Sequence, residues 1–273
     1  MCAILLHIPL KTGAGFFSVC SFILLHIMYC INDRGQLPDM VDSSDQFDLY
    51  KPGALTDVTY HFFEHYRNVH VVPAITTAVH NFNCWTSQYD SYATLDFKNL
   101  VPIVKKYFSP SVLVQAKIAK LKDTYGVDPS CTIGVHYRGT DKQVETQTPE
   151  FEVFYLKMRE LSEQNPDCKI LLQTDTAQFV DYIRSKDLKN VVMFEDIKPS
   201  YTTKGVHNEN SKEQNYKDMQ ILLPSLYIMS TCRHIVCGSG NCPLWMMFFR
   251  GHNHNVHQCY NNAWYPVVPE AKT

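Results

Sequence analysis

The residues of this chain best suited to chemistry stand in the stretch CTIGVHYRGTDKQVETQTPEF, residues 131 to 151. It begins with the alternation of a buried strand, and ionisable residues follow from the end of that strand: His136, Arg138, Lys142 and Glu145. A guanidinium can hold two phosphate oxygens at once, and a carboxylate in a partly buried cleft can act as a general base. The stretch therefore predicts a site that binds an anion and moves a proton. The alternatives are an ion pair within the loop and a core position for His136.

A second stretch with the chemistry of an anion site is GSGN, which contains Ser239, Gly240 and Asn241. It leads directly into an apolar helical pattern that begins near Cys242, so backbone N–H groups and the helix dipole would favour a phosphate there. The patterns GxGxxG and GxxxxGK[ST] are both absent from the sequence, which argues against a dinucleotide dehydrogenase and a P-loop kinase. A diphosphate bound without these signatures suggests a nucleotide sugar.

The elements that must position these residues alternate between strands and helices in the second half of the chain. Strands are predicted at 132–137, 169–174, 190–194 and 234–238. Helices are predicted at 149–164 with Thr148 as cap, at 177–185, at 213–232 with a kink at Pro224, and at 242–249. This order predicts an α/β fold with a doubly wound parallel sheet. The strand ends HYRGTDK, QTDT (with Asp175), FEDIK and CGSGN would then share one rim, where such sheets bind ligands.

The N-terminal residues predict a strand, a Gly-rich turn and a buried helix. Two apolar stretches surround KTGAG, which contains Gly13 and Gly15. A signal peptide or membrane anchor is the alternative, but no basic residue precedes the first stretch. The second stretch has about 16 residues, fewer than the roughly 20 that span a bilayer. The sequence thus predicts no stable membrane insertion.

The middle of the chain is harder to read. A helix at 55–66 and a strand at 68–75 are predicted, followed by helices at 97–108 and 109–126. Ser109 would cap the last of these helices and Gly126 would end it. The predicted domains are an N-terminal, acceptor-side half at 1–108, a donor-binding half at 109–250, and a tail at 251–273 that packs back on the N-terminal half.

Composition narrows the classes of protein. The 273 residues are 45% hydrophobic, and 25 Lys and Arg against 27 Asp and Glu give a net charge of −2. This balance gives no electrostatic signature of binding to nucleic acid or to an anionic membrane. The ten cysteines include no CxxC pair and no N-x-S/T sequon is present, which favours a reducing, cytoplasmic location for a bacterial or viral protein. The tryptophans Trp85, Trp245 and Trp264 could serve as sugar platforms, but we expect them to pack in the protein. The pattern of His252, His254, His257 and Cys259 could bind zinc, but we expect it to arise from chance spacing.

Several motifs in order resemble the fucosyltransferase-like superfamily, which includes core alpha-1,6-fucosyltransferases, bacterial nodulation fucosyltransferases and protein O-fucosyltransferases. GVHYRGTDK is similar to the HxRxTDK-type signature of that group, and QTDT to its short acidic motif. SLYIMSTCRHIVCGSGN resembles the helix, turn and phosphate loop of the family, and KTGAGFFS resembles its N-terminal Gly-rich loop. The resemblance covers roughly residues 11 to 30 and 130 to 250.

The resemblance implies a GT-B-like arrangement of two Rossmann-like halves, with doubly wound parallel sheets and the nucleotide sugar bound mainly by the C-terminal half. It implies inverting sugar transfer without a metal or other cofactor, and the sequence contains no D-x-D pair to hold a divalent ion. Arg138 would neutralise the leaving diphosphate. His136 would lie against the nucleotide, and Asp175 would face the cleft. The phosphate would be cradled by Ser239, Gly240 and Asn241.

Two departures from the family pattern leave the donor open between GDP-fucose and a UDP-sugar. Gly139 stands where core fucosyltransferases have a second Arg, and Ser225 aligns with the Asp that reads guanine. Asp218, two helical turns earlier, could supply that carboxylate. A xylosyltransferase on the same fold is one alternative, and an inert sugar-nucleotide or glycan-binding module is another. The expected acceptor is an oligosaccharide or glycoprotein, and Glu145 is the predicted catalytic base.

Overall fold

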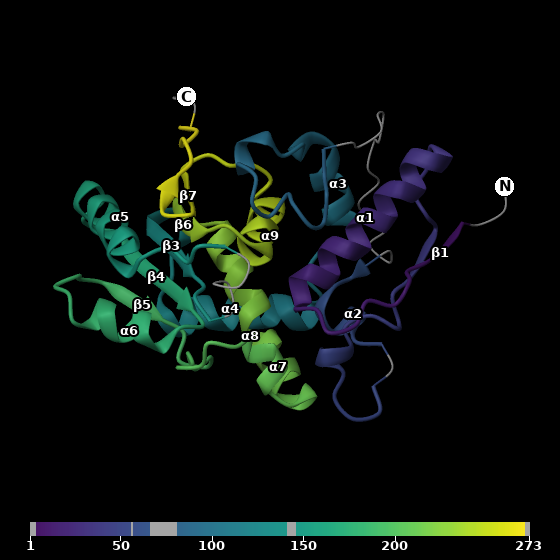
Figure 1. Ribbon diagram of the computed structural model, residues 1–273, viewed down its shortest axis with the longest axis horizontal. Coiled ribbons are helices and arrows are strands. Elements are labelled where there is room, and N and C mark those ends of the chain that lie inside the picture. The colour runs from purple at the N-terminus through teal and green to yellow at the C-terminus, as the bar shows by residue number, and fades with distance from the viewer. Residues whose placement is uncertain (1–3, 56, 66–80, 141–145, 271–273) are drawn as a thin grey trace.

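The computed structural model describes residues 4–55, 57–65, 81–140 and 146–270. Its largest unit is a six-stranded sheet with the strand order β5-β4-β3-β6-β7-β8, shown on the left and in the centre of Figure 1. The strands are β3 (Thr132–Tyr137), β4 (Lys169–Thr174), β5 (Val191–Met193), β6 (His234–Gly238), β7 (Val256–Tyr260) and β8 (Ala263–Trp264). All neighbours pair in parallel except β7 and β8. The prediction of a parallel α/β sheet is confirmed.

Alternation along the strands divides the core into two layers. On β3, Ile133, Val135 and Tyr137 pack under α5 (Phe151–Gln164) and α6 (Ala177–Arg184) in one cluster. The intervening positions face α8 (Lys212–Ser230), and a Cβ at Gly134 would lie 3.5 Å from the Cβ of Met229. Side chains of successive strand residues point to opposite faces. His136 and Arg138 are therefore placed on the α8 side of the sheet.

The N-terminal part of the chain builds a smaller βαβ unit. β1 (Leu5–His7) pairs in parallel with β2 (Met40–Asp42), and α1 (Phe16–Arg34) connects them. The predicted strand, Gly-rich turn and buried helix are thus confirmed. By length and composition α1 could also cross a membrane, but 67% of its most apolar window is buried inside the protein. The predicted strand at 68–75 lies outside the described residues, so a second doubly wound sheet stays a prediction.

One hydrophobic core joins the two parts. It contains side chains of α1, of α3 (Phe97–Tyr107), of α8 and of α9 (Asn241–Arg250). Its central residue is Trp245, which is fully buried, and the indole Nε1 donates to Ser21 Oγ at 2.9 Å. The helix α4 (Val112–Tyr125) packs on α8 along the outside. The two parts are therefore held by a continuous apolar interior.

Several helix boundaries differ from the predicted ones. Ser111 caps α4 by accepting from Val114 N at 3.3 Å, whereas the hydroxyl of Ser109, the predicted cap, donates to Lys105 O. The helix predicted at 55–66 is only α2 (Thr59–Phe62), and the helix predicted from 149 begins at Phe151. The hydroxyl of Thr148 is buried and has no partner among the described residues, so it is not the cap of α5. At α4 the error arose because two serines, Ser109 and Ser111, lie two residues apart and either could cap the helix.

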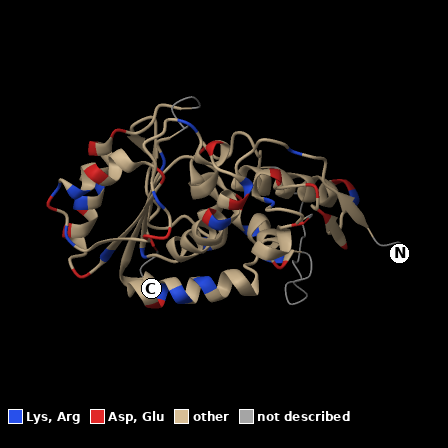
Figure 2. Cartoon of the chain, turned by 90° about the horizontal axis from the view of Figure 1, so that it is seen from below, with Lys and Arg blue, Asp and Glu red and all other residues tan. Residues whose placement is uncertain are grey.

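The tail predicted to pack back on the N-terminal half extends the large sheet through β7 and β8. It also contacts the N-terminal part, because Gln258 Nε2 donates to Asp90 O and Tyr265 Oη donates to Tyr89 O, both at 2.9 Å. The shorter elements among the described residues include the 3-10 turns η1 (Asp48–Tyr50), η3 (Tyr92–Thr94) and η4 (Pro129–Cys131), and the helix α7 (Val206–Glu209). Figure 2 shows that the positions of Lys and Arg are interspersed with those of Asp and Glu along the described part of the chain.

Candidate active site

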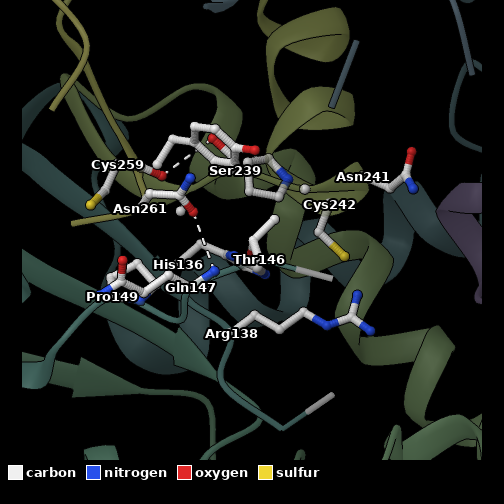
Figure 3. Close-up of a pocket in the computed structure, with 14 residues that line it drawn as sticks. His136, Arg138, Thr146, Gln147, Pro149, Ser239, Asn241, Cys242, Cys259 and Asn261 are labelled. Atoms are coloured by element: carbon white, nitrogen blue, oxygen red, sulfur yellow. Dashed lines mark hydrogen bonds between the residues drawn. The ribbon is translucent and has the colours of Figure 1, made fainter. Parts of the chain in front are cut away.

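The order of the strands defines where a ligand can enter. From β3 the chain crosses to β4 and then to β5 on one side, whereas β6 pairs with the other side of β3. The direction of winding therefore reverses between β3 and β6. Ligands of open α/β sheets bind at the carboxyl ends of the strands at such a switch point. The carboxyl ends of these two strands lead into Arg138 and into the Gly238–Asn241 loop, which line one pocket (Figure 3).

Arg138 is held beside Asp175 at the end of β3. The guanidinium Nε lies 3.7 Å from Asp175 Oδ2, and both side chains are one-quarter exposed. The Asp175 carboxylate also accepts from Gly139 N at 3.1 Å, and from the hydroxyls of Thr140 and Thr176, each at 2.8 Å. These bonds tie the start of the β3 loop to the end of β4. Asp175 faces the cleft as expected, but its oxygens serve to orient the loop and Arg138.

Gly139 has a steric reason to be glycine. A Cβ at this position would lie 2.9 Å from Thr176 Oγ1 and 2.9 Å from Tyr137 Cε1, which is closer than real Cβ contacts. Tyr137 cannot move easily because its ring stacks on Phe179 with centroids 4.1 Å apart. A second arginine at position 139 would not fit this loop. The departure from the family pattern is therefore built into the packing beneath it.

His136 lines the pocket as a buried, neutral imidazole. It is 5% exposed, and its pKa is lowered to about 4. Burial is the main cause, Asp175 opposes the shift, and Arg138 contributes to it. Its Nδ1 is buried without a hydrogen-bond partner in the described part of the chain. A buried nitrogen left unpaired costs free energy unless a ligand satisfies it. The position thus favours contact with a bound ligand over a satisfied core role.

The candidate phosphate loop, residues 239–241, offers backbone groups to the pocket, because its polar side chains are bonded to other parts of the protein. Ser239 Oγ donates to Cys259 O at 3.2 Å and accepts from Gln258 Nε2 at 2.9 Å. The amide of Asn241 bonds Ser21 and Gln88, and in Figure 3 it points away from the pocket. The helix α9 begins after Gly240 without a side-chain cap. Its first-turn N–H groups therefore point out of the helix end towards the pocket.

A second helix begins at the same cleft. Gly13, with φ of +66°, and Gly15, which precedes α1, both line it, and α1 also lacks a side-chain cap. Phe16 N bonds Tyr50 Oη at 2.9 Å, which fixes this end of the helix. Two helix N-termini and the Arg138 guanidinium thus carry positive charge to one cleft. Such an arrangement attracts anions.

The cleft has a volume of about 600 Å³ and extends from Arg138 to α8. At the α8 end, Asp218 lines it together with the apolar side chains of Met219 and Leu222. The Asp218 carboxylate accepts from Gln214 Nε2 at 2.7 Å and from Asn210 Nδ2 at 3.0 Å. Burial raises the pKa of Asp218 above its usual value, with the Gln214 bond opposing the shift. This end combines apolar walls with one carboxylate.

Other predicted site residues lie elsewhere. Ser225 is fully buried in α8, where its hydroxyl donates to Ile221 O at 2.7 Å, and it lines neither pocket. The prediction of Ser225 as a nucleotide contact is therefore wrong, because the serine faces the helix interior. Lys142 and Glu145 lie outside the described residues. The described residues on the two sides of them, Arg138 and Thr146, line the same pocket.

Sequence reasoning missed two contributors to the cleft. His207 lies on the short helix α7, and its Cε1 would be 3.6 Å from a Cβ at Gly15. Trp85 stands in a turn at 83–89, and its side chain is 57% exposed at the cleft, so the prediction that it packs in the core is wrong. Neither segment has a sequence periodicity that places it near the sheet. Packing was correctly predicted for Trp245, which is buried, and for Trp264, which lies against Phe154 at 5.5 Å between ring centroids.

Metal coordination was considered for the histidine-rich tail. Within the described ranges, no three His, Cys, Asp or Glu side chains are grouped as metal ligands. His257 is buried in β7, and its pKa is lowered to about 4 by burial and by Lys157 and His234. His252 and His254 contact each other with ring centroids 4.9 Å apart.

Comparisons with solved structures identify the fold. No protein-family model matches the chain, and no curated protein matches its sequence. A crystal structure of NodZ alpha-1,6-fucosyltransferase co-crystallized with GDP aligns over 96% of both chains, with 12% sequence identity and a TM-score of 0.57. This chain has the fold of NodZ. A structure of the fucosyltransferase NodZ from Bradyrhizobium aligns over 96% of this chain and 100% of that chain, at 12% identity and a TM-score of 0.53.

Another NodZ structure, soaked with GDP-fucose, aligns over 60% of this chain and 49% of that chain, at 15% identity and a TM-score of 0.43. This alignment spans about half of that NodZ chain. The two alignments that extend over nearly the whole chain of NodZ show that the two proteins share a fold.

Proposed function

We propose that the protein is a glycosyltransferase that transfers a sugar from a nucleotide diphosphate sugar to a hydroxyl of a glycan. The observation that carries the proposal is the convergence of Arg138 and the N-terminus of α9 at the switch point between β3 and β6. This is an anion site on a fold similar to that of NodZ, which was co-crystallized with GDP. The second Rossmann-like half of a GT-B arrangement belongs to the proposal.

The donor would lie along the cleft with its two ends in different surroundings. Its diphosphate would meet Arg138 and the first-turn amides of α9. Its base would meet Asp218 between apolar side chains of α8. A guanine edge presents two N–H donors, which one carboxylate can accept as a pair. Because Ser225 is buried inside α8, its presence does not argue for a uridine donor, so GDP-fucose is favoured over a UDP-sugar.

The proposed chemistry is inverting transfer. The acceptor oxygen bonds to the anomeric carbon while the bond from that carbon to the diphosphate oxygen breaks, and the diphosphate departs with the electron pair. Arg138 and the helix N-termini stabilise the charge that develops on the leaving group, which supports transfer without a metal ion. The acceptor proton goes to a carboxylate, for which we propose Glu145. Asp175 is a poor choice because its oxygens already accept three hydrogen bonds.

Calorimetric titration with GDP and with UDP, in metal-free buffer and again with chelator, tests the proposal. We expect GDP to bind at least about a hundredfold more tightly, because a site built to pair with one base leaves polar groups unpaired with another. Asp218→Ala should remove most of this preference. The matched control is Glu163→Ala on the exposed face of α5, which should leave both affinities unchanged.

The alternative outcomes separate the candidate functions. If UDP binds more tightly than GDP, the donor is a UDP-sugar and not GDP-fucose, and the proposed role of Arg138 is unchanged. GDP binding without nucleotide release on addition of any glycan acceptor would indicate an inert binding module. Failure to bind either nucleotide would refute the glycosyltransferase proposal.

A further inference from the structure

Trp85 occupies an unusual place for an indole. Its side chain is 57% exposed and lines the cleft next to the turn that carries Gln88 and Tyr89. It does not line the smaller pocket around Arg138 and the α9 loop. Aromatic side chains at the wall of a cleft commonly make contact with ligands, since leaving so large an apolar surface in water is unfavourable.

The turn that presents Trp85 is fixed by hydrogen bonds. Asn83 Oδ1 accepts from Trp85 N at 2.8 Å, and Gln88 Nε2 donates to Trp85 O at 3.1 Å. Gln88 Oε1 in turn accepts from Asn241 Nδ2 at 3.1 Å, which ties the turn to the first residue of α9. The indole is therefore anchored beside the proposed diphosphate site. A ligand that contacts it would not have to order the loop first.

Lys11 supports the indole. The Lys11 ammonium lies 4.2 Å from the centroid of the Trp85 ring, and burial lowers the Lys11 pKa. It also donates to Ser18 Oγ at 3.1 Å, at the start of α1. A cation over an indole is an attractive contact that holds the ring in place. Lys11 does not line the cleft, whereas Trp85 does, so the amine supports the ring from outside the cleft.

The geometry points to Trp85 as the platform for the acceptor, a pyranose ring of an oligosaccharide that stacks on the indole. A gluco-configured pyranose carries its hydroxyls around the ring edge and C–H groups on its faces, which suits one aromatic face surrounded by polar groups. Gln88 and Ser18, which also line the cleft, are suited to bond the hydroxyls. The expected occupant is thus a pyranose ring that presents C–H groups on one face and hydroxyls at its edge. The role of this saccharide as the acceptor rests on the proposed function, whereas its binding to Trp85 does not.

Trp85 does not line the smaller pocket assigned to the diphosphate, and it comes from a different segment of the cleft wall than Asp218. The diphosphate end is lined by Arg138 and the α9 loop, and the base end by Asp218 on α8. Trp85 belongs to the N-terminal part of the chain, which joins the cleft from the side of α1. A sugar on this ring would therefore contact the N-terminal part of the chain and lie next to the donor. Loss of the ring should affect the glycan and spare the nucleotide.

The test compares Trp85→Ala and Trp85→Phe with the unchanged protein. Cellotetraose and chitotetraose serve as probes, and their binding is measured by saturation-transfer NMR titration, with GDP affinity measured by calorimetry on the same samples. Trp85→Ala should weaken saccharide binding about tenfold or more and leave GDP affinity within about twofold. Trp85→Phe should restore most of the saccharide affinity. Trp264→Phe, a packing residue, is the matched control and should change neither affinity.

Each result supports or overturns the platform. Equal saccharide binding by Trp85→Ala, or no saccharide binding by the unchanged protein, would overturn it. A parallel loss of GDP affinity would assign the ring to the donor and also overturn it. If the unchanged protein binds a saccharide through Trp85 but no nucleotide, the platform stands and the proposed transferase function fails.

Discussion

The residues at the end of β3 work as one unit in which each side chain has a different task. Arg138 brings the charge, Asp175 holds its guanidinium and the loop, and Gly139 leaves room for Thr176 and Tyr137. The bonds to Asp175 are made within the protein before any ligand arrives. An anion therefore meets a charge that is already oriented, which is the condition for strong electrostatic stabilisation.

Arg138→Ala should abolish sugar transfer. Removing one oriented donor to a developing charge commonly lowers turnover by about a hundredfold or more. The midpoint of thermal unfolding should stay nearly unchanged, because the Arg138–Asp175 pair is partly exposed and separated by 3.7 Å. Nucleotide-release kinetics and differential scanning fluorimetry measure the two effects.

Arg159→Ala, on the half-exposed face of α5, controls for loss of one positive charge and should retain activity. Transfer that survives in Arg138→Ala would contradict the assignment of Arg138 to the leaving group.

The elements meet around a cluster of aromatic rings. Trp245 on α9 lies 4.7 Å from Phe108 and 5.5 Å from Phe248, measured between ring centroids. Phe17 on α1 lies 6.0 Å away on another side. These contacts join α1 to α9, the two helices whose N-termini open on the cleft. Packing at this cluster therefore sets the relative position of the two helix ends.

Trp245→Ala should lower the free energy of unfolding by about 3 to 5 kcal/mol, the usual cost of removing a fully buried aromatic side chain. The exposed Trp85 provides the comparison, and Trp85→Ala should cost about 1 kcal/mol or less. Urea denaturation followed by circular dichroism measures both. Similar losses in the two variants would mean that the indole of Trp85 is buried in solution.

For the whole molecule, we expect the free energy of unfolding to fall at acidic pH. His136 and His257 are buried, and burial lowers the pKa of each to about 4. In the unfolded chain a histidine titrates near 6.5, so between about pH 6.5 and pH 4 the unfolded state binds more protons. Stability is thus full above this window and declines as the pH falls through it.

His257→Gln should make the loss of stability between pH 6.5 and pH 4 shallower by about 3 kcal/mol, the value that corresponds to the shift of its pKa. The variant retains every carboxylate, so the difference between the two proteins isolates the histidine. Urea midpoints at half-unit pH steps measure it. Parallel curves for the two proteins would show that His257 titrates normally in the fold.

The thiols of the chain test the expected reducing environment. The nine described cysteines are all thiols outside any disulfide, and Cys131 Sγ and Cys168 Sγ approach to 3.2 Å at the starts of β3 and β4. We expect most of the ten cysteines to react with a thiol reagent in denaturant. Quantitative pairing in protein purified without reductant would contradict a cytoplasmic location.

The sequence by itself determined the C-terminal sheet and the motifs at its edge. Strands such as Thr132–Tyr137 are apolar and bounded by polar turns, so local pattern and propensity agree with the final structure. The Gly-rich starts of α1 and α9 were likewise visible, because glycine before a helix is a local signal. The error at Ser109 was also local, since Ser111, two residues away, is an equally good cap.

Only the tertiary structure decided which of the candidate residues share a cleft. Ser225 and Asp218 lie on one helix, yet the first faces the interior and the second faces the cleft, because the packing of α8 fixes its rotation. The turn that carries Trp85 is tied to the cleft through Gln88, which bonds Asn241, 153 residues away in sequence. The strand order that places β3 beside β6 is a long-range pairing as well. Such contacts leave no periodic trace in the sequence, so no local pattern could have predicted them.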